Sequence, residues 1–171
     1  RVCGKAEIGS AYLFSLGFNL SSANELVGGS RLAFRPKEAL QKARLLEAQG
    51  ERSSASTQYA ILSVYYRRKK RVSDGLKMIE RAMALDPGNS RLWVLRALCE
   101  LAAGHLASAE EWIEKYATRA LEKSESGPYR DYLAKQSEGN AEPLAWFDSR
   151  IGQASQPQSV KLEPLSAKGT G

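Results

Sequence analysis

The residues that could take part in acid–base or metal chemistry are few and lie far apart. The chain has one histidine, His105, which follows Gly104 in an expected turn between helices. No second histidine, cysteine or acidic residue stands at the spacing of a zinc site. Carboxylates such as Glu110, Glu111 and Glu114 are expected on a helix surface, where solvent covers them. We therefore predict no catalytic residue, no metal and no cofactor, and we expect the protein not to be an enzyme.

The two cysteines, Cys3 and Cys99, lie too far apart in the sequence to read as a disulfide framework or a metal motif. Cys99 stands in an apolar segment, which indicates a buried thiol. This cysteine usage fits a reducing compartment. A cytoplasmic location is therefore favoured, while a periplasmic or membrane-associated one stays open.

The sequence contains no apolar run that approaches the roughly 20 residues needed to cross a bilayer. The chain begins at Arg1 rather than at Met. We expect a processed product or an excised piece, in which a signal peptide or membrane anchor upstream of Arg1 would not be seen.

Positive charge is concentrated in one stretch, the basic run, which consists of Arg67, Arg68, Lys69, Lys70 and Arg71. The formal net charge is +6 and the sequence pI is near 9.4, and the rest of the chain is nearly balanced. The basic run is expected in a turn, where solubilising charge is one interpretation. The others are a contact with an acidic partner, RNA or anionic lipid, or a nuclear-import signal. Nucleic-acid binders usually spread basic and aromatic residues over a face, so nucleic acid ranks behind a protein partner.

The elements that would position these residues are indicated by an internal repeat with a spacing of 34 residues. Residues of one size class recur at this spacing: Tyr59 with Trp93, Ser63 with Ala97, Gly75 with Ala109, and Ile79 with Ile113. The small residues would let two antiparallel helices approach closely, and the large ones would fill the space between helices. Pro87 cannot continue a helix, so the chain is expected to reverse after it.

The repeat resembles the tetratricopeptide family, whose pattern is an aromatic residue, Leu, a small residue and Tyr, then small and large apolar residues and Pro. The matching residues are Tyr59, Leu62, Ser63, Tyr66, Gly75, Ile79, Ala82 and Pro87. The resemblance implies an all-α fold: a right-handed superhelix of antiparallel helix pairs, about three pairs plus a capping helix. We expect helices near residues 57–69, 73–85, 90–103 and 107–123.

The domain organisation follows from how far each segment keeps this pattern. In the second unit Arg96, Glu100, Tyr116 and Leu121 replace the expected Leu, Tyr, Ala and Pro, so this unit is more like an end unit. The predicted segments are a degenerate N-terminal repeat region over 4–55, a repeat over 56–89, a divergent repeat over 90–123, a capping helix with a short apolar segment over 124–150, and a disordered tail over 151–171.

The resemblance also implies a binding surface, because such repeats hold peptides on the concave face made by the first helix of each pair. The residues placed on that face are Thr57, Ala60, Val64, Arg68, Arg91, Val94, Leu98 and Ala102. Family members that clamp a C-terminal carboxylate use Lys and Asn there, whereas this chain has Val and Ala, which speaks against chaperone-tail binding. A mainly apolar groove would suit an amphipathic or extended apolar segment. The alternative is a groove that is shallow or covered by the chain's own ends.

The function that we predict is a protein–protein interaction scaffold or adaptor without catalysis. One alternative is the soluble tetratricopeptide portion of a larger, membrane-anchored assembly factor. Another is a nucleic-acid-binding helical solenoid that uses the basic run. The identity of the partner is not encoded in any motif of the sequence.

Overall fold

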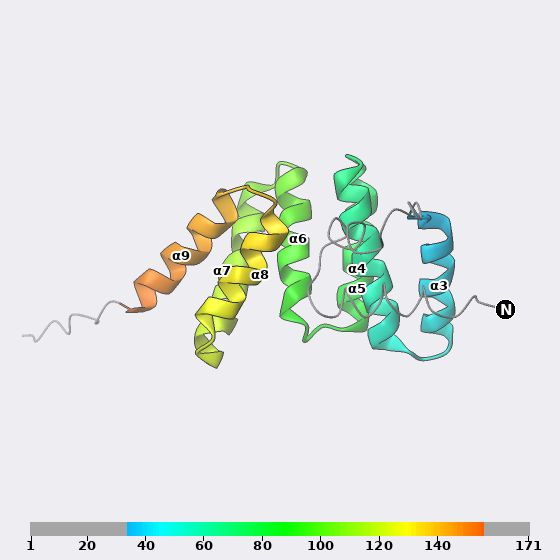
Figure 1. Cartoon of the computed structure of the whole chain (residues 1–171), viewed down its shortest axis with the longest axis horizontal. Coiled ribbons are helices and arrows are strands. Elements are labelled where there is room, and N and C mark those ends of the chain that lie inside the picture. The colour runs from blue at the N-terminus through cyan, green and yellow to red at the C-terminus, as the bar shows by residue number, and fades with distance from the viewer. Residues whose placement is uncertain (1–33, 156–171) are drawn as a thin grey trace, which may run out of the picture.

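The computed structural model describes residues 34–155, and all the regular secondary structure of this part is helical. Its helices follow one another from α3 at one end to α9 at the other, and α5 overlaps α4 in this view (Figure 1). They are α3 (Pro36–Ala48), α4 (Arg52–Arg68), α5 (Val72–Leu85), α6 (Ser90–Ala102), α7 (Leu106–Lys123), α8 (Ser126–Ser137) and α9 (Glu142–Ser155). The predicted all-α class is thus confirmed over this part. Among these helices, none has the length and hydropathy of a membrane span.

The four helices expected between residues 57 and 123 are present, and the first begins earlier than predicted. Helix α4 starts at Arg52, so residues 52–55 belong to it and not to the preceding repeat region. Side chains at the start of α4 donate hydrogen bonds to carbonyls at the end of α5. The guanidinium of Arg52 donates to the carbonyls of Ala84 and Leu85, and the buried hydroxyl of Ser56 donates to the carbonyl of Ala82. The bonds from Arg52 satisfy two carbonyls that the last turn of α5 leaves without intrahelical partners. The Ala82 carbonyl also accepts from the backbone N–H of Asp86.

The small residues of the repeat lie where helices approach one another. Ser63, Gly75, Ala97 and Ala109 are all buried, as the spacing predicted. Helices α4 and α5 pack as one pair, and α6 and α7 pack as the next. Apolar side chains then fill the space between the pairs, with Ile79 and Ile113 fully buried.

Helix α3 lies within the repeat region predicted over 4–55 and packs against α4. The hydroxyl of Tyr59 on α4 donates to the carboxylate of Glu47 on α3, and Arg81 of α5 pairs with the same carboxylate. The part of the predicted repeat region that precedes residue 34 lies outside the described residues. The tail predicted to be disordered over 151–171 is corrected at its start, because residues 151–155 belong to α9 (Glu142–Ser155), and the rest of it lies outside the described residues.

The segment after α7 differs from the prediction, because it forms a third helix pair. The expected short apolar segment is the middle of α9, a helix that runs past residue 150 to Ser155. Helix α9 packs on α7 and α8, and its Phe147 is buried in one cluster with Leu133 of α8 and Tyr116 of α7. Tyr116 thus fills the space beneath the third pair. The divergent unit over 90–123 is therefore an interior unit and not an end unit.

Candidate protein-interaction surface

The apolar residues that the sequence placed on the concave face are buried. Ala60, Val64, Val94 and Leu98 are each at most 4% exposed. Val94 and Leu98 belong to the same apolar cluster as Leu133, so α8 covers this part of α6. The expectation of an open apolar groove is corrected here: α8 covers Val94 and Leu98, whereas Ala60 and Val64 are buried in the apolar cluster formed by α3 to α6. The missing signal was the length of α8 and α9, which do not keep the repeat pattern.

The remaining members of the predicted groove lie nearer the surface, and two of them are charged. Thr57 is half-buried and its hydroxyl donates to the carbonyl of Ser53, a bond within α4. Ala102 is exposed at the end of α6. Arg91 is exposed at the start of α6, and its guanidinium lies 5.3 Å from the ring centroid of Tyr132 on α8, which is a cation–π contact.

The basic run divides between a helix and a turn, where the sequence had placed all of it in a turn. Arg67 and Arg68 form the last residues of α4, whereas Lys69, Lys70 and Arg71 connect it to α5 and are exposed. Arg71 forms an ion pair with Asp74 at 2.6 Å. The five charges therefore do not all point outward, and the side chain of Arg67 is only 14% exposed.

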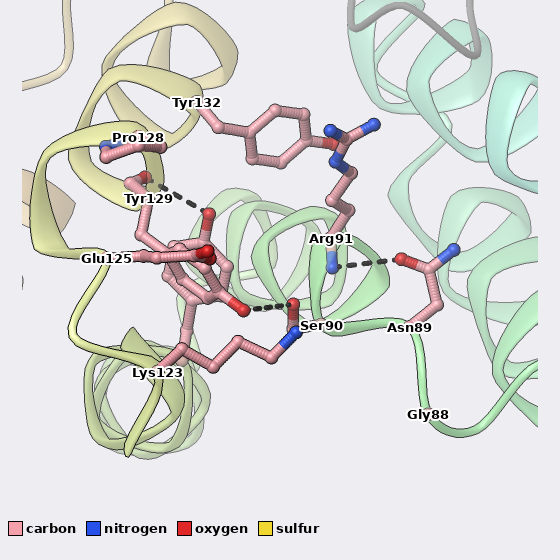
Figure 2. Close-up of a pocket in the computed structure, with 10 residues that line it drawn as sticks. Gly88, Asn89, Ser90, Arg91, Lys123, Glu125, Pro128, Tyr129 and Tyr132 are labelled. Carbon is pink, nitrogen blue, oxygen red and sulfur yellow. Dashed lines mark hydrogen bonds between the residues drawn. The ribbon is translucent and has the colours of Figure 1, made fainter. Parts of the chain in front are cut away.

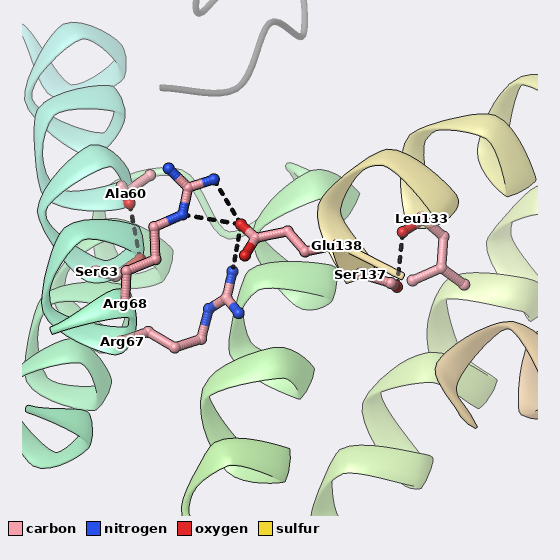
Figure 3. A network of polar contacts seen from close by, with 7 residues as sticks. All are labelled: Ala60, Ser63, Arg67, Arg68, Leu133, Ser137 and Glu138. Carbon is pink, nitrogen blue, oxygen red and sulfur yellow. Dashed lines mark hydrogen bonds and ion pairs between the residues drawn. The ribbon is translucent and has the colours of Figure 1, made fainter. Parts of the chain in front are cut away.

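Arg67 and Arg68, at the end of α4, contact a carboxylate at the end of α8 (Figure 3). Oε1 of Glu138, the residue that follows α8, accepts from Nε of Arg68 at 2.8 Å and from Nη2 of Arg68 at 2.5 Å. The same oxygen lies 3.5 Å from Nη2 of Arg67. We call these three residues the Arg–Glu bridge. It joins α4 to α8 across α6, which is visible behind the bridge in Figure 3.

A recess of about 370 Å³ lies at the other end of α8, beside the start of α6 (Figure 2). The lining residues are Gly88, Asn89, Ser90, Arg91, Tyr116, Lys123, Glu125, Pro128, Tyr129 and Tyr132. Several of them are fixed in place. The side chain of Asn89 caps α6 by accepting from the backbone N–H of Arg91, and the hydroxyl of Tyr116 donates to the carbonyl of Tyr129. Burial raises the pKa of the Tyr116 and Tyr132 hydroxyls, so both are neutral donors at ordinary pH.

Arg96 and Glu100 stand where the repeat pattern predicts Leu and Tyr, and they form a polar network near the C-terminal end of α6. The buried carboxylate of Glu100 pairs with Arg96 at 2.6 Å and with Nδ1 of His105 at 2.7 Å, and Arg96 also reaches Glu80 on α5. Burial acts to raise the pKa of Glu100. Hydrogen bonds from His105 and Arg96 and the charge of Arg96 outweigh this effect and hold the pKa below its usual value. His105 is exposed at the turn where the sequence placed it, and its bond to Glu100 was not predicted because no motif links the two residues.

The thiol of Cys99 is buried on α6, as the sequence predicted. Burial raises its pKa to about 11, although the nearby charges of Arg67 and Arg96 act in the opposite direction. Such a thiol stays protonated and is a poor nucleophile at neutral pH. Over residues 34–155, no group of three His, Cys, Asp or Glu side chains is arranged to hold a metal ion.

Comparison of the chain with models of protein families, with curated proteins and with solved structures gives no match.

Proposed function

We propose that the chain is an interaction scaffold of the tetratricopeptide type, which holds a segment of a partner protein and catalyses no reaction. The 34-residue repetition, the buried small residues at the helix crossings and the succession of helix pairs support this proposal. Stacked helix pairs make an extended surface, and such surfaces serve as binding sites in repeat proteins. The surface in question is the face formed by α4, α6 and α8.

The observation that carries the proposal is the recess at the start of α6 and α8. Three tyrosines and an arginine line it, and these residue types contribute most strongly to binding energy at protein interfaces. The hydroxyl of Tyr116 donates to the backbone carbonyl of Tyr129, the rings of these two residues pack with centroids 4.8 Å apart, and the ring of Tyr132 lies beneath the guanidinium of Arg91. Because these side chains are already ordered, a partner would bind them with little loss of side-chain entropy. The recess is an anchor point for a partner side chain on an otherwise filled face.

The test is a comparison of two charge-matched variants in a co-purification experiment. Arg91→Glu combined with Lys123→Glu alters two residues that line the recess. Lys42→Glu combined with Lys77→Glu makes the same change in charge at exposed positions of α3 and α5. We expect proteins that co-purify with the unmodified chain to be lost from the first variant and kept by the second. Circular dichroism verifies that both variants are folded.

The scaffold proposal would be wrong if the two variants retained the same proteins in the same amounts. It would also be wrong if the unmodified chain captured nothing beyond what an unrelated helical protein captures. A protein that is lost only from the Arg91 and Lys123 variant, and that an unrelated helical protein does not capture, is then purified. Its binding to the purified chain should be lost when Arg91 and Lys123 alone are replaced.

A further inference from the structure

The Arg–Glu bridge brings two guanidinium groups to one carboxylate oxygen, and this leaves positive charge in excess. Glu138 gives Oε1 to both arginines, and this one carboxylate must balance two cations. Lys69 and Lys70 follow directly and are exposed, while Arg71 is balanced by Asp74. The end of α4 is therefore a cluster of cations larger than the chain's own acids neutralise there.

One donor of the bridge is left without a hydrogen bond. Nη2 of Arg67 is buried, and no atom of the described residues accepts from it in good geometry, because Oε1 of Glu138 is 3.5 Å away and is already shared with Arg68. A buried donor without an acceptor is costly to a fold. A second carboxylate oxygen at this position would accept from Nη2 of Arg67. The two arginines can therefore bind more carboxylate groups than Glu138 alone supplies.

Glu138 can leave the arginines without disturbing the core. It follows the last residue of α8 in the left-handed conformation, with φ of 52°, and its side chain is 37% exposed. The neighbouring Ser137 is buried and its hydroxyl donates to the carbonyl of Leu133, so the backbone end of α8 is anchored independently (Figure 3). Rotation of the Glu138 side chain alone would uncover Arg67 and Arg68.

The aromatic residues beside the cluster favour a protein ligand over a nucleic acid. Sequence-tolerant binding of single strands uses free aromatic faces on which bases stack. The ring of Tyr65 packs against Phe34 at 4.9 Å between centroids, and the ring of Tyr66 lies beneath the guanidinium of Arg71. With both rings occupied, the cluster offers charge and hydrogen-bond donors, which are the groups that recognise carboxylates.

We infer that Arg67 and Arg68, flanked by Lys69 and Lys70, form a recognition site for an acidic segment of a partner protein, and that Glu138 occupies this site in the free chain. This inference rests on the proposed scaffold function and adds the chemistry of the partner. A run of Asp or Glu side chains would displace Glu138 and supply the acceptor that Arg67 lacks. Because Glu138 competes with the partner, its presence lowers the apparent affinity of the site.

The test measures binding of a fluorescein-labelled polyglutamate peptide by fluorescence anisotropy at low salt. Glu138→Gln removes the internal competitor, and Asp148→Asn is the matched control, since it removes one carboxylate from an exposed pair with Arg130. We expect Glu138→Gln to bind the peptide about two- to fivefold more tightly than the unmodified chain, the range of a partly exposed ion pair. Asp148→Asn should shift the affinity by less. Arg68→Gln should weaken binding relative to Arg130→Gln, which makes the same change in charge.

Two results would overturn the inference. In the first, Glu138→Gln and Asp148→Asn bind polyglutamate equally, which means that general charge and not the bridge controls affinity. In the second, an oligouridine of the same charge binds more tightly than polyglutamate and is lost on Arg68→Gln, which assigns the site to nucleic acid. The recess at the opposite end of α8 shares no residue with this site, so a negative result here leaves the co-purification test of the scaffold unaffected.

Discussion

The Cα of Gly75 on α5 lies directly against the backbone of Ser63 on α4: a Cβ built on Gly75 would be 3.2 Å from the carbonyl oxygen of Ser63. The thiol of Cys99 on α6 closes the third side of the same space, at 3.6 Å. Helices α4, α5 and α6 therefore meet at Gly75, which has no side chain. The distance between α4 and α5 depends on the absence of that side chain, and this makes the position a direct test of the packing.

Replacement of Gly75 by Leu should destabilise the protein by about 1–3 kcal/mol, because the new side chain has no space between α4 and α5. Urea unfolding followed by circular dichroism measures this loss. Gly88→Leu is the control, since no atom lies within 4 Å of a Cβ built at Gly88. Equal stabilities of the two variants would contradict the close approach of the helices.

The position of Gly75 was predictable from the sequence, and so were the helices that meet there. Small residues recur 34 positions apart, and only a close helix crossing explains Gly75 and Ala109 in the same register. Periodic size patterns survive in the sequence because each helix pair faces the same steric problem. The core of the two middle pairs follows directly from this pattern.

The closure of the predicted groove was not predictable in the same way. Leu133 covers Val94 and Leu98, and it belongs to a helix without the repeat pattern. The Arg–Glu bridge joins residues 70 positions apart, and no local signal links Arg68 to Glu138. Contacts of this kind depend on how the last helix pair docks, which composition and periodicity do not specify.

Tyr116 should be a major support of the third helix pair. The residue is 2% exposed, and its ring packs against Tyr129 of α8 and Phe147 of α9. Tyr116→Ala should lower the free energy of unfolding by about 3–5 kcal/mol because it leaves a large cavity. Tyr116→Phe removes only the hydrogen bond to the Tyr129 carbonyl and should cost about 1 kcal/mol. Chemical unfolding of both variants gives the comparison, and similar losses for Ala and Phe would argue against the docking of α8 and α9.

Replacement of Lys70 by glycine should stabilise the protein. It follows α4 in the left-handed conformation, with φ of 60°, which glycine adopts without steric cost. Lys70→Gly should therefore raise the free energy of unfolding by up to about 1 kcal/mol. Lys69→Gly makes the same change in charge at a residue with φ of −81°, where glycine gives no such relief. If thermal unfolding showed no difference between the two variants, the left-handed turn after α4 would be in doubt.

Glu100 should make the protein sensitive to acid. Its pKa is lowered in the folded chain, despite burial, by hydrogen bonds from His105 and Arg96 and by the charge of Arg96. A lowered folded-state pKa means that the unfolded chain binds the proton more tightly. The contribution of Glu100 to stability is therefore complete above the ordinary carboxyl pKa of about 4.3 and declines as the pH falls through the lower, folded-state value.

The replacement Glu100→Gln measures this contribution, because glutamine keeps the shape of the side chain and cannot ionise. At neutral pH the variant should be less stable by about 1–3 kcal/mol, since Arg96 loses a charged, buried partner. As the pH falls below about 4, protonation of Glu100 in the unmodified chain should bring the two stabilities together. Urea titrations at several pH values provide the test, with Glu110→Gln as the control at an exposed position of α7. A stability difference between the unmodified chain and Glu100→Gln that stays constant from neutral to acid pH would mean that the carboxylate of Glu100 contributes packing alone.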